Sequence, residues 1–248
     1  MATEENTQNP FTRPGFIAAA IVVALLVVLG LVIAIINATR AESNPDPTPP
    51  VATTVATPST SETTPTDAAA SICGLKDDTA GPTPVSPPKA LWEYQDTTAY
   101  PTSETYGPGA NDPAGFRYCF KHSPTGALFA ATNAAVLGSD TKIAGVWLDY
   151  FLAPGPYRQD LLDQGSSNDP GSGVRINIEG FRVLSYTADA ARVDIAVRGI
   201  ADGKTVNLSM VYALVWVDGD WKLDVRDPKS PIDVANIPDL NGYIPWGE

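Results

Sequence analysis

The sequence predicts an α+β domain in which helices come first and a curved four-stranded antiparallel sheet follows and packs on them. Three observations lead to this class. Apolar residues recur with a helical period between residues 123 and 164, they alternate with a period of two from residue 174 onward, and tight-turn pairs separate the alternating segments. Helices followed by strands, rather than the two in alternation, are typical of α+β folds.

The helical half begins at a strong start signal. Residues 118–122 are expected to form a short strand that leads directly into it. Ser123 is a favourable N-cap and Pro124 suits the first helical position, so a helix is expected over residues 127–137. Gly138 is expected to end this helix.

A second helix is expected next, with Ser139 or Asp140 as its cap. Its apolar positions follow the stripe of an amphipathic helix. They are Ile143, Val146, Trp147, Tyr150 and Phe151. Residues 154–156 break this helix, residues 157–164 are expected to form a short third helix, and residues 165–173 an exposed loop.

The sheet half is expected to contain four strands joined by tight turns. Alternation marks residues 174–186, where Gly180 indicates a bulge, and then residues 192–198. A long strand over residues 205–217 and a short one over residues 220–226 complete an antiparallel meander. The two-residue turns are Asp202-Gly203 and Asp218-Gly219.

Residues 15–36 form an uninterrupted apolar run. At about 1.5 Å per residue, a helix of this length spans roughly 33 Å, enough to cross a bilayer. A cleaved secretory signal is the alternative, but its apolar region is usually about 7–15 residues long. We therefore expect a retained transmembrane helix over residues 15–37, with residues 1–14 as a cytoplasmic tail. Arg13 and Arg40 flank the two ends, so the positive-inside bias is weak.

A disordered stalk is expected over residues 38–72. Six Pro, eight Thr and four Ser make up 18 of the 32 residues from 41 to 72. Such a segment cannot bury enough apolar surface to offset its ordering entropy. The exported domain beyond it, residues 73–248, is expected to consist of an irregular wrap (73–115), a core (116–226) and a tail that runs over the surface (227–248).

The chain has two cysteines, Cys73 and Cys119. An even pair in an exported domain is expected to form one disulfide. Two unpaired buried thiols are the alternative. Closing the loop between these residues would stabilise the fold by about 4 kcal/mol in the chain-entropy model.

Composition excludes several classes of function. The net charge of −12, from 16 basic and 28 acidic residues, argues against direct nucleic-acid binding, which needs many Lys and Arg contacts with phosphates. Two cysteines and one histidine are too few for a four-Cys zinc site, an iron–sulfur cluster or a multi-His centre. A Gly-rich phosphate loop, a Rossmann fingerprint and a Gly-x-Ser-x-Gly elbow are all missing. We therefore expect no catalytic, cofactor-binding or metal-binding residues, and no enzymatic activity.

Three sets of side chains are candidates for chemistry, and each has a simpler interpretation. His122 is the one candidate histidine base, but its place at a helix entrance favours a structural or surface role. Asp149 and Tyr150 on the second helix can face a pocket, although carboxylates on helices are usually solvated. An acidic cluster can attract a cation, but turn chemistry and solvent exposure explain it. Its members are Asp218, Asp220 and Asp224.

The segment YCFKHSPTGALFAATN, residues 118–133, resembles the strand-to-helix opening of membrane-anchored exported proteins of actinobacteria, many of them associated with conjugative elements. Three helices followed by four meandering strands are similar to the nuclear transport factor 2-like cone. That fold also occurs in the extracytoplasmic domains of type IV secretion assembly proteins. The resemblance covers roughly residues 73–226, and it implies a cone-shaped sheet and the same layout of tail, span, stalk and domain.

The resemblance implies a non-enzymatic, single-pass protein of the cell membrane, with its N-terminus cytoplasmic and its C-terminal domain extracytoplasmic. The domain would bind other envelope or conjugation proteins as a scaffold in DNA transfer or secretion, and residues 15–37 would contact the lipid bilayer. A homo-oligomer is compatible with this layout. A passive surface lipoprotein is less favoured, because Cys73 lies far from the apolar run.

The alternative is a small-molecule-binding or isomerase-like exported domain that uses the pocket of the cone. An acid or a tyrosine beside an open cavity in the cone would favour this alternative. An interior filled by apolar side chains would favour the scaffold. The side chains expected to fill it are Trp147, Ile176, Val193, Leu208 and Met210.

Overall fold

The computed structural model describes residues 70–248, except residues 141, 168–175 and 202–203. The expected tail, transmembrane helix 15–37 and nearly all of the stalk lie outside these residues and stay predictions. Within the described part of the chain, no helix is both long and apolar enough to cross a membrane.

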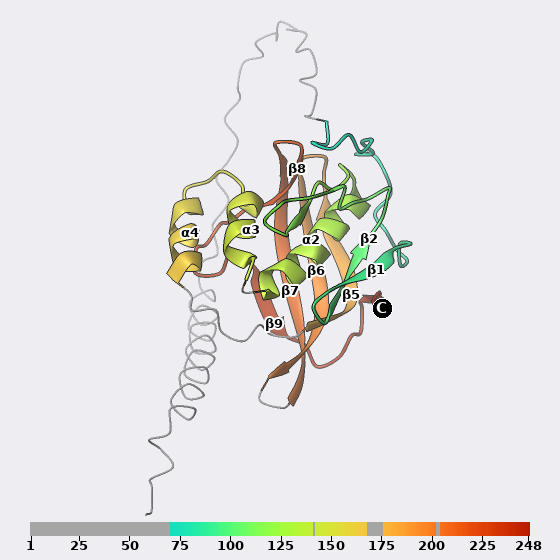
Figure 1. Cartoon of the computed structure of the whole chain (residues 1–248). Helices are drawn as coiled ribbons and strands as arrows, with labels where there is room; N and C mark the ends of the chain where they lie inside the picture. The colour runs from blue at the N-terminus through green and yellow to red at the C-terminus, as the bar shows by residue number, and fades with distance from the viewer. Residues whose placement is uncertain (1–69, 141, 168–175, 202–203) are drawn as a thin grey trace, which may run out of the picture. The chain divides into compact units, whose positions relative to one another are not determined.

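The described chain is mostly β, with three helices between four short strands and a larger sheet (Figure 1). The elements are β1 (Leu91–Gln95), β2 (Thr98–Thr102), β3 (Ala110–Asn111), β4 (Arg117–Tyr118), α2 (Pro124–Ser139), α3 (Ala144–Phe151), α4 (Arg158–Ser167), β5 (Ile176–Tyr186), β6 (Ala190–Ala201), β7 (Lys204–Val217), β8 (Asp220–Leu223), β9 (Asp233–Asn236) and β10 (Ile244–Pro245). The larger sheet is antiparallel and runs β10-β5-β6-β7, with β8 and β9 both paired to β7.

The prediction of helices packed on a four-stranded curved sheet was therefore wrong. The sheet has six strands, because the tail expected to run over the surface supplies β9 and β10. All four residues of β9 are exposed and β10 has only two residues, so neither strand carries an apolar alternation. Helices also do not come first: β1 pairs with β2 inside the segment expected to be an irregular wrap, and β3 of that segment pairs with β4 at the start of the expected core.

The first helix, α2, begins where the sequence predicts. The Ser123 hydroxyl accepts a hydrogen bond from the Gly126 N–H at 3.0 Å, and Pro124 occupies the first turn. Gly138 does not end the helix; it lies inside α2, facing the Trp147 ring of α3. The expected strand before the helix is reduced to β4, because Cys119 has a φ of +66°.

The other two helices differ from the prediction mainly at their ends. Neither Ser139 nor Asp140 caps α3, which begins at Ala144 without a side-chain cap. Of its expected apolar stripe, Trp147 and Phe151 are buried. The last described helix, α4, extends three residues past its expected end to Ser167, and the rest of the expected loop lies outside the described residues.

The turns of the sheet agree with the sequence where they are described. Asp218 and Gly219 have φ values of +54° and +75°, as a two-residue hairpin of this type requires. The Asp202-Gly203 pair lies outside the described residues. A register shift marks the expected bulge at Gly180, where a Cβ atom would come within 2.7 Å of the Ile244 carbonyl oxygen. Glycine therefore allows β10 to approach β5.

The core lies between α2 and one face of the sheet, and Figure 1 shows α2 crossing that face. Thirteen of the sixteen residues of α2 are buried, many of them Ala, so the helix backbone lies close to its neighbours. Of the side chains expected inside, three are buried and two are partly buried. Trp147, Ile176 and Val193 belong to the first group, and Leu208 and Met210 to the second.

The C-terminal residues of the chain pack against this core. The Trp246 ring makes edge contacts with Trp92, Phe129 and Phe181, with ring centroids 5.2 to 5.5 Å apart. Its indole N–H donates to the Pro88 carbonyl oxygen at 3.1 Å. One aromatic side chain thus joins the C-terminal strand, the β1–β2 hairpin and α2.

Candidate binding groove

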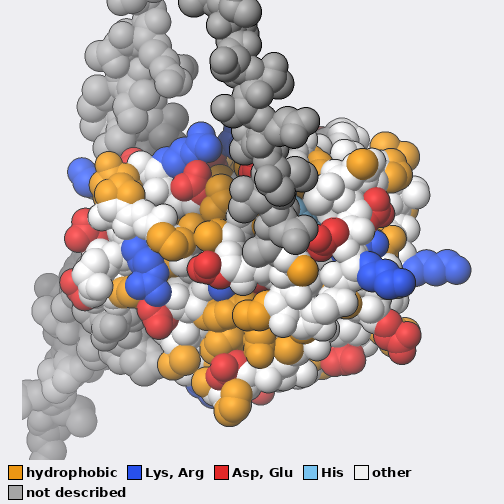
Figure 2. Space-filling view, turned by 90° about the horizontal axis from the view of Figure 1, so that it is seen from above, with side chains coloured by type: hydrophobic (Ala, Val, Ile, Leu, Met, Phe, Trp, Pro, Cys, Tyr) orange, Lys and Arg blue, Asp and Glu red, His pale blue; other side chains and the backbone are white. Residues whose placement is uncertain are grey.

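A groove of about 730 Å³ lies where α3, the start of α4, β8 and the first described residues meet. Phe116 and Leu152 are buried in its walls, with 4% and 3% of their surface exposed. Ile72 and Val146 lie at its opening and are 55% and 56% exposed. Figure 2 shows this end of the molecule from above, with hydrophobic side chains among acidic and basic ones. The groove therefore offers an apolar surface within a charged border.

Three aromatic rings lie together at the inner side of the groove. The Tyr150 ring centroid is 5.3 Å from that of Phe116 and 5.1 Å from that of Tyr118. Burial raises the pKa of Tyr150, so its hydroxyl stays protonated and donates to the Asp220 carboxylate at 2.7 Å. Asp149 and Tyr150 both line this groove, and the Asp149 side chain is 65% exposed, so the less favoured interpretation of a pocket and the preferred one of a solvated carboxylate both fit.

Asp220 holds the backbone beneath the groove. Its carboxylate is 1% exposed and accepts hydrogen bonds from the backbone N–H groups of Cys119 at 2.7 Å and Phe120 at 2.8 Å. Burial raises the pKa of Asp220, and the hydrogen bonds from Phe120, Tyr150 and Cys119 oppose this rise. The interpretation of Asp220 as a solvated turn residue was wrong. That interpretation fits Asp218, which lies exposed in the β7–β8 turn.

Lys222, two residues along β8, also lines the groove but is turned into the protein. It is 6% exposed, its ammonium group donates to the Tyr150 carbonyl oxygen at 2.8 Å, and its Nζ lies 3.0 Å from the Tyr150 ring centroid. Burial lowers the pKa of Lys222 to about 8, although the Asp220 and Asp218 carboxylates oppose this. In the described part of the chain, no carboxylate oxygen lies within 4 Å of its Nζ.

The remaining charged side chains of the groove are mostly acidic. Asp149 on α3 and Arg158 on α4 form an ion pair at 2.6 Å. Asp112 accepts only a backbone N–H, from Ala114 at 2.8 Å, and neither it nor Asp218 joins an ion pair among the described residues. Three Asp against one Lys and one Arg give the lining a net charge of −1.

The predicted cysteine pair is confirmed and lies next to this site. The Sγ atoms of Cys73 and Cys119 are 2.02 Å apart, and Ile72 of the groove directly precedes Cys73. The positive φ of Cys119 is a conformation that a non-glycine residue rarely adopts. The Asp220 hydrogen bond to the Cys119 N–H stabilises it.

His122 lies away from the groove and is fully buried. Its ring is stacked on Trp216 with centroids 3.9 Å apart, and its Nε2 lies 2.6 Å from the Ala188 carbonyl oxygen. Of the two roles expected for this residue, the surface role was wrong and the structural one fits the geometry. A ring sealed in this way cannot take a proton from a substrate.

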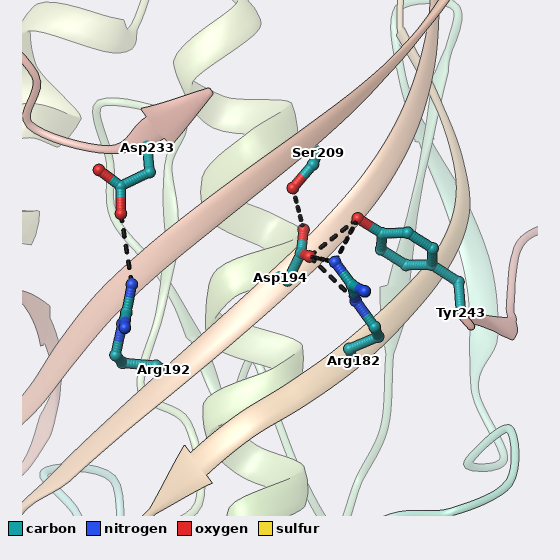
Figure 3. A network of polar contacts seen from close by, with 6 residues as sticks. All are labelled: Arg182, Arg192, Asp194, Ser209, Asp233 and Tyr243. Carbon is teal, nitrogen blue, oxygen red and sulfur yellow. Dashed lines mark hydrogen bonds and ion pairs between the residues drawn. The ribbon is translucent and has the colours of Figure 1, made fainter. Parts of the chain in front are cut away.

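A second polar network lies on the sheet, centred on Asp194 of β6 (Figure 3). Asp194 is fully buried and accepts hydrogen bonds from Ser209 at 2.7 Å, from Tyr243 at 2.8 Å and from the Arg182 guanidinium. Both of its oxygens are therefore occupied. The network joins the C-terminal segment to strands β5, β6 and β7.

The fold and the groove together define a β-rich domain with a filled interior and an open apolar groove on its surface. The model of the family described as "Domain of unknown function (DUF8175)" matches residues 53–245, so the chain belongs to this family. The match includes every described strand and helix and every residue of the groove. Searches of curated proteins and of solved structures return no match.

Proposed function

We propose that this chain is a non-enzymatic, single-pass envelope protein whose exported domain binds other proteins, as a scaffold in conjugative DNA transfer or secretion. The observation that carries the proposal is the contrast between a filled interior and an open groove. Leu128, Phe129 and Ile195 have no exposed surface between α2 and the sheet, whereas Ile72 and Val146 expose more than half of theirs beside the groove. Exposed apolar surface with a polar border is typical of protein-binding sites.

Two further features support the export of this domain. Disulfides such as that between Cys73 and Cys119 form and persist in oxidising compartments outside the cytoplasm. The apolar run ahead of it is long enough for a membrane anchor. Residues 118–133 resemble anchored actinobacterial proteins, many of them associated with conjugative elements, and this resemblance supports the assignment to conjugation.

A small-molecule-binding or isomerase-like domain is the second candidate, and one observation favours it: Tyr150 and Asp220 are hydrogen-bonded beside an open groove. An isomerase, however, needs an acid or base that reaches its substrate. The Asp220 carboxylate is 1% exposed and accepts two backbone N–H groups from the disulfide segment. This arrangement serves the fold, so the scaffold is the better-supported function.

The test is a crosslinking pull-down of the full-length protein from its native membranes, with the recovered proteins identified by mass spectrometry. We expect envelope or conjugation components to be enriched over a pull-down of an unrelated single-pass protein expressed at the same level. Recovery of the chain alone, as a clean monomer, would overturn the proposal.

A further inference from the structure

We infer that the groove lined by Phe116, Val146 and Leu152 binds a basic polypeptide segment of a protein partner, one in which Lys or Arg alternates with apolar residues. This inference rests on the proposed function and deepens it. Three properties of the groove support it: its apolar walls, the sign of its accessible charge, and the burial of Lys222, whose ammonium group bonds within the protein.

The apolar walls need an apolar occupant. Ile72 from the first described residues and Val146 from α3 lie at the opening, and Phe116 and Leu152 extend the surface inward. A Leu or Phe side chain placed between them would remove apolar area from water on both partners, which is the main driving force of association. The groove is open, so an extended segment can lie along it without any movement of the fold.

The accessible charge is negative. Asp149 and Arg158 neutralise one another at 2.6 Å. Lys222 is 6% exposed and uses its ammonium group on the Tyr150 carbonyl oxygen and ring. Asp112 and Asp218 are left as carboxylates that form no ion pair within the described residues, so an occupant with positive charge complements this border.

The positive charge is more simply supplied by side chains than by a metal ion. No group of three or more His, Cys, Asp or Glu in the described residues is placed to hold a metal. A Lys or Arg beside an apolar residue satisfies both halves of the groove, because its aliphatic stem packs on apolar surface while its charged end reaches the carboxylates. The chain's net charge of −12 further attracts a basic partner over a longer range.

The experiment measures binding of fluorescent octapeptides to the full-length protein in lipid nanodiscs by fluorescence anisotropy. Three peptides are compared: Leu alternating with Lys, Leu alternating with Glu, and Ser alternating with Lys. We expect the Leu/Lys peptide to bind tightest and to weaken as salt rises. Equal or tighter binding of the Leu/Glu peptide would overturn the inference.

Two variants, each with a matched control, test whether the peptide binds in the groove. Asp218→Asn removes one border charge, and Asn is tolerated at the positive φ of this turn. We expect about a threefold to fivefold loss of affinity, as for one exposed ion pair. Asp96→Asn is the control: Asp96 has the same backbone conformation, with a φ of +52°, in the turn between β1 and β2 and outside the groove.

Val146→Lys introduces a like charge and removes an apolar contact, and we expect a loss of more than tenfold. Its control is Leu184→Lys, at an exposed apolar position on β5. Both positions are exposed, so the variants are expected to keep the circular dichroism spectrum and melting temperature of the wild type. Equal affinity in all four variants would overturn the inference.

The pull-down with the same four variants separates this inference from the proposed function. If Asp218→Asn and Val146→Lys lose the partners and both controls retain them, the result supports both the groove inference and the scaffold function. Partners recovered equally from all four would overturn the groove as the binding site while the scaffold function stands. Failure to recover any partner, even with the wild type, would overturn the scaffold function, and the peptide measurements then decide the groove alone.

Discussion

The Tyr150 hydroxyl donates to the Asp220 carboxylate at 2.7 Å and joins α3 to β8, two elements 70 residues apart in the chain. The same Asp220 oxygen accepts the backbone N–H of Cys119, one residue of the disulfide. Helix, edge strand and disulfide segment therefore meet on one buried carboxylate. The geometry of the groove depends on this junction, because Tyr150 forms part of its lining.

Tyr150→Phe is predicted to destabilise the fold by about 1–2 kcal/mol, because it leaves a buried carboxylate oxygen with one donor fewer. The ring and its contacts with Phe116 and Tyr118 are kept, so the loss reports the hydroxyl alone. Urea denaturation monitored by circular dichroism measures it.

The control for this prediction is Tyr157→Phe. The Tyr157 hydroxyl forms no side-chain hydrogen bond among the described residues, so this variant is expected to stay within about 0.5 kcal/mol of the wild type. Equal stability of both variants and the wild type would show that the hydrogen bond to Asp220 contributes nothing.

The elements that the sequence predicts correctly are those determined by interactions between residues close together in the chain. The start of α2 follows from Ser123 and Pro124, and the β7–β8 hairpin follows from Asp218-Gly219, because each signal acts within a few residues of itself. The strand β9 has no such signal: all four of its residues are exposed, and it forms because the edge of β7 offers backbone partners.

The charged residues of the groove show the same limit of local sequence patterns, which do not reveal contacts with distant parts of the chain. The pattern Asp220-Trp221-Lys222 reads as a solvent-facing end of a strand, yet both charged residues are buried. Their burial depends on Tyr150 and on the disulfide segment near Cys119, which lie 70 and 101 residues from Asp220 in the chain. The sequence indicated a pocket at Asp149 and Tyr150 only as the less favoured interpretation. It gave no sign of Lys222, since no local pattern distinguishes a buried lysine from a solvated one.

Removal of the disulfide with Cys73→Ser and Cys119→Ser together is predicted to lower the free energy of unfolding by about 4 kcal/mol, because the open chain gains loop entropy. Denaturant titration of the double variant against the oxidised wild type measures this loss. Labelling of the wild type from its native membranes with a thiol-reactive maleimide, after denaturation without reductant, is expected to modify no cysteine. Modification of both cysteines would contradict the disulfide and the export of the domain.

Trp246→Ala is predicted to destabilise the domain by about 3–5 kcal/mol, although the residue lies near the end of the chain, because it removes a large buried aromatic. Trp246 contacts rings from β1, α2 and β5, so the loss extends across the core. Thermal denaturation followed by tryptophan fluorescence measures the effect. The neighbouring Pro245 is exposed, and Pro245→Ala is expected to change stability by no more than about 0.5 kcal/mol. A small effect of Trp246→Ala would mean that the C-terminal segment is dispensable for folding.

The lowered pKa of Lys222 predicts an unusual dependence of stability on pH. Its pKa falls from an ordinary value of 10.5 to about 8 in the folded protein, because burial disfavours the charged amine. Between these two values the unfolded chain binds more protons at this site than the folded chain, so the contribution of Lys222 to stability increases as pH rises from 8 toward 10.5. Below pH 8 the amine is charged in both states and its contribution is constant.

Lys222→Met removes this titration and keeps an unbranched side chain in the same space. The difference in the free energy of unfolding, wild type minus Lys222→Met, is expected to grow in favour of the wild type between pH 8 and pH 10, as measured by urea denaturation at each pH. Lys142→Met, measured in the same way, is the matched control for replacing a lysine by methionine, because the Lys142 side chain is 76% exposed and lies outside the groove. A Lys222 difference that is flat over this range would show that the amine keeps an ordinary pKa, and would contradict its withdrawal from the groove.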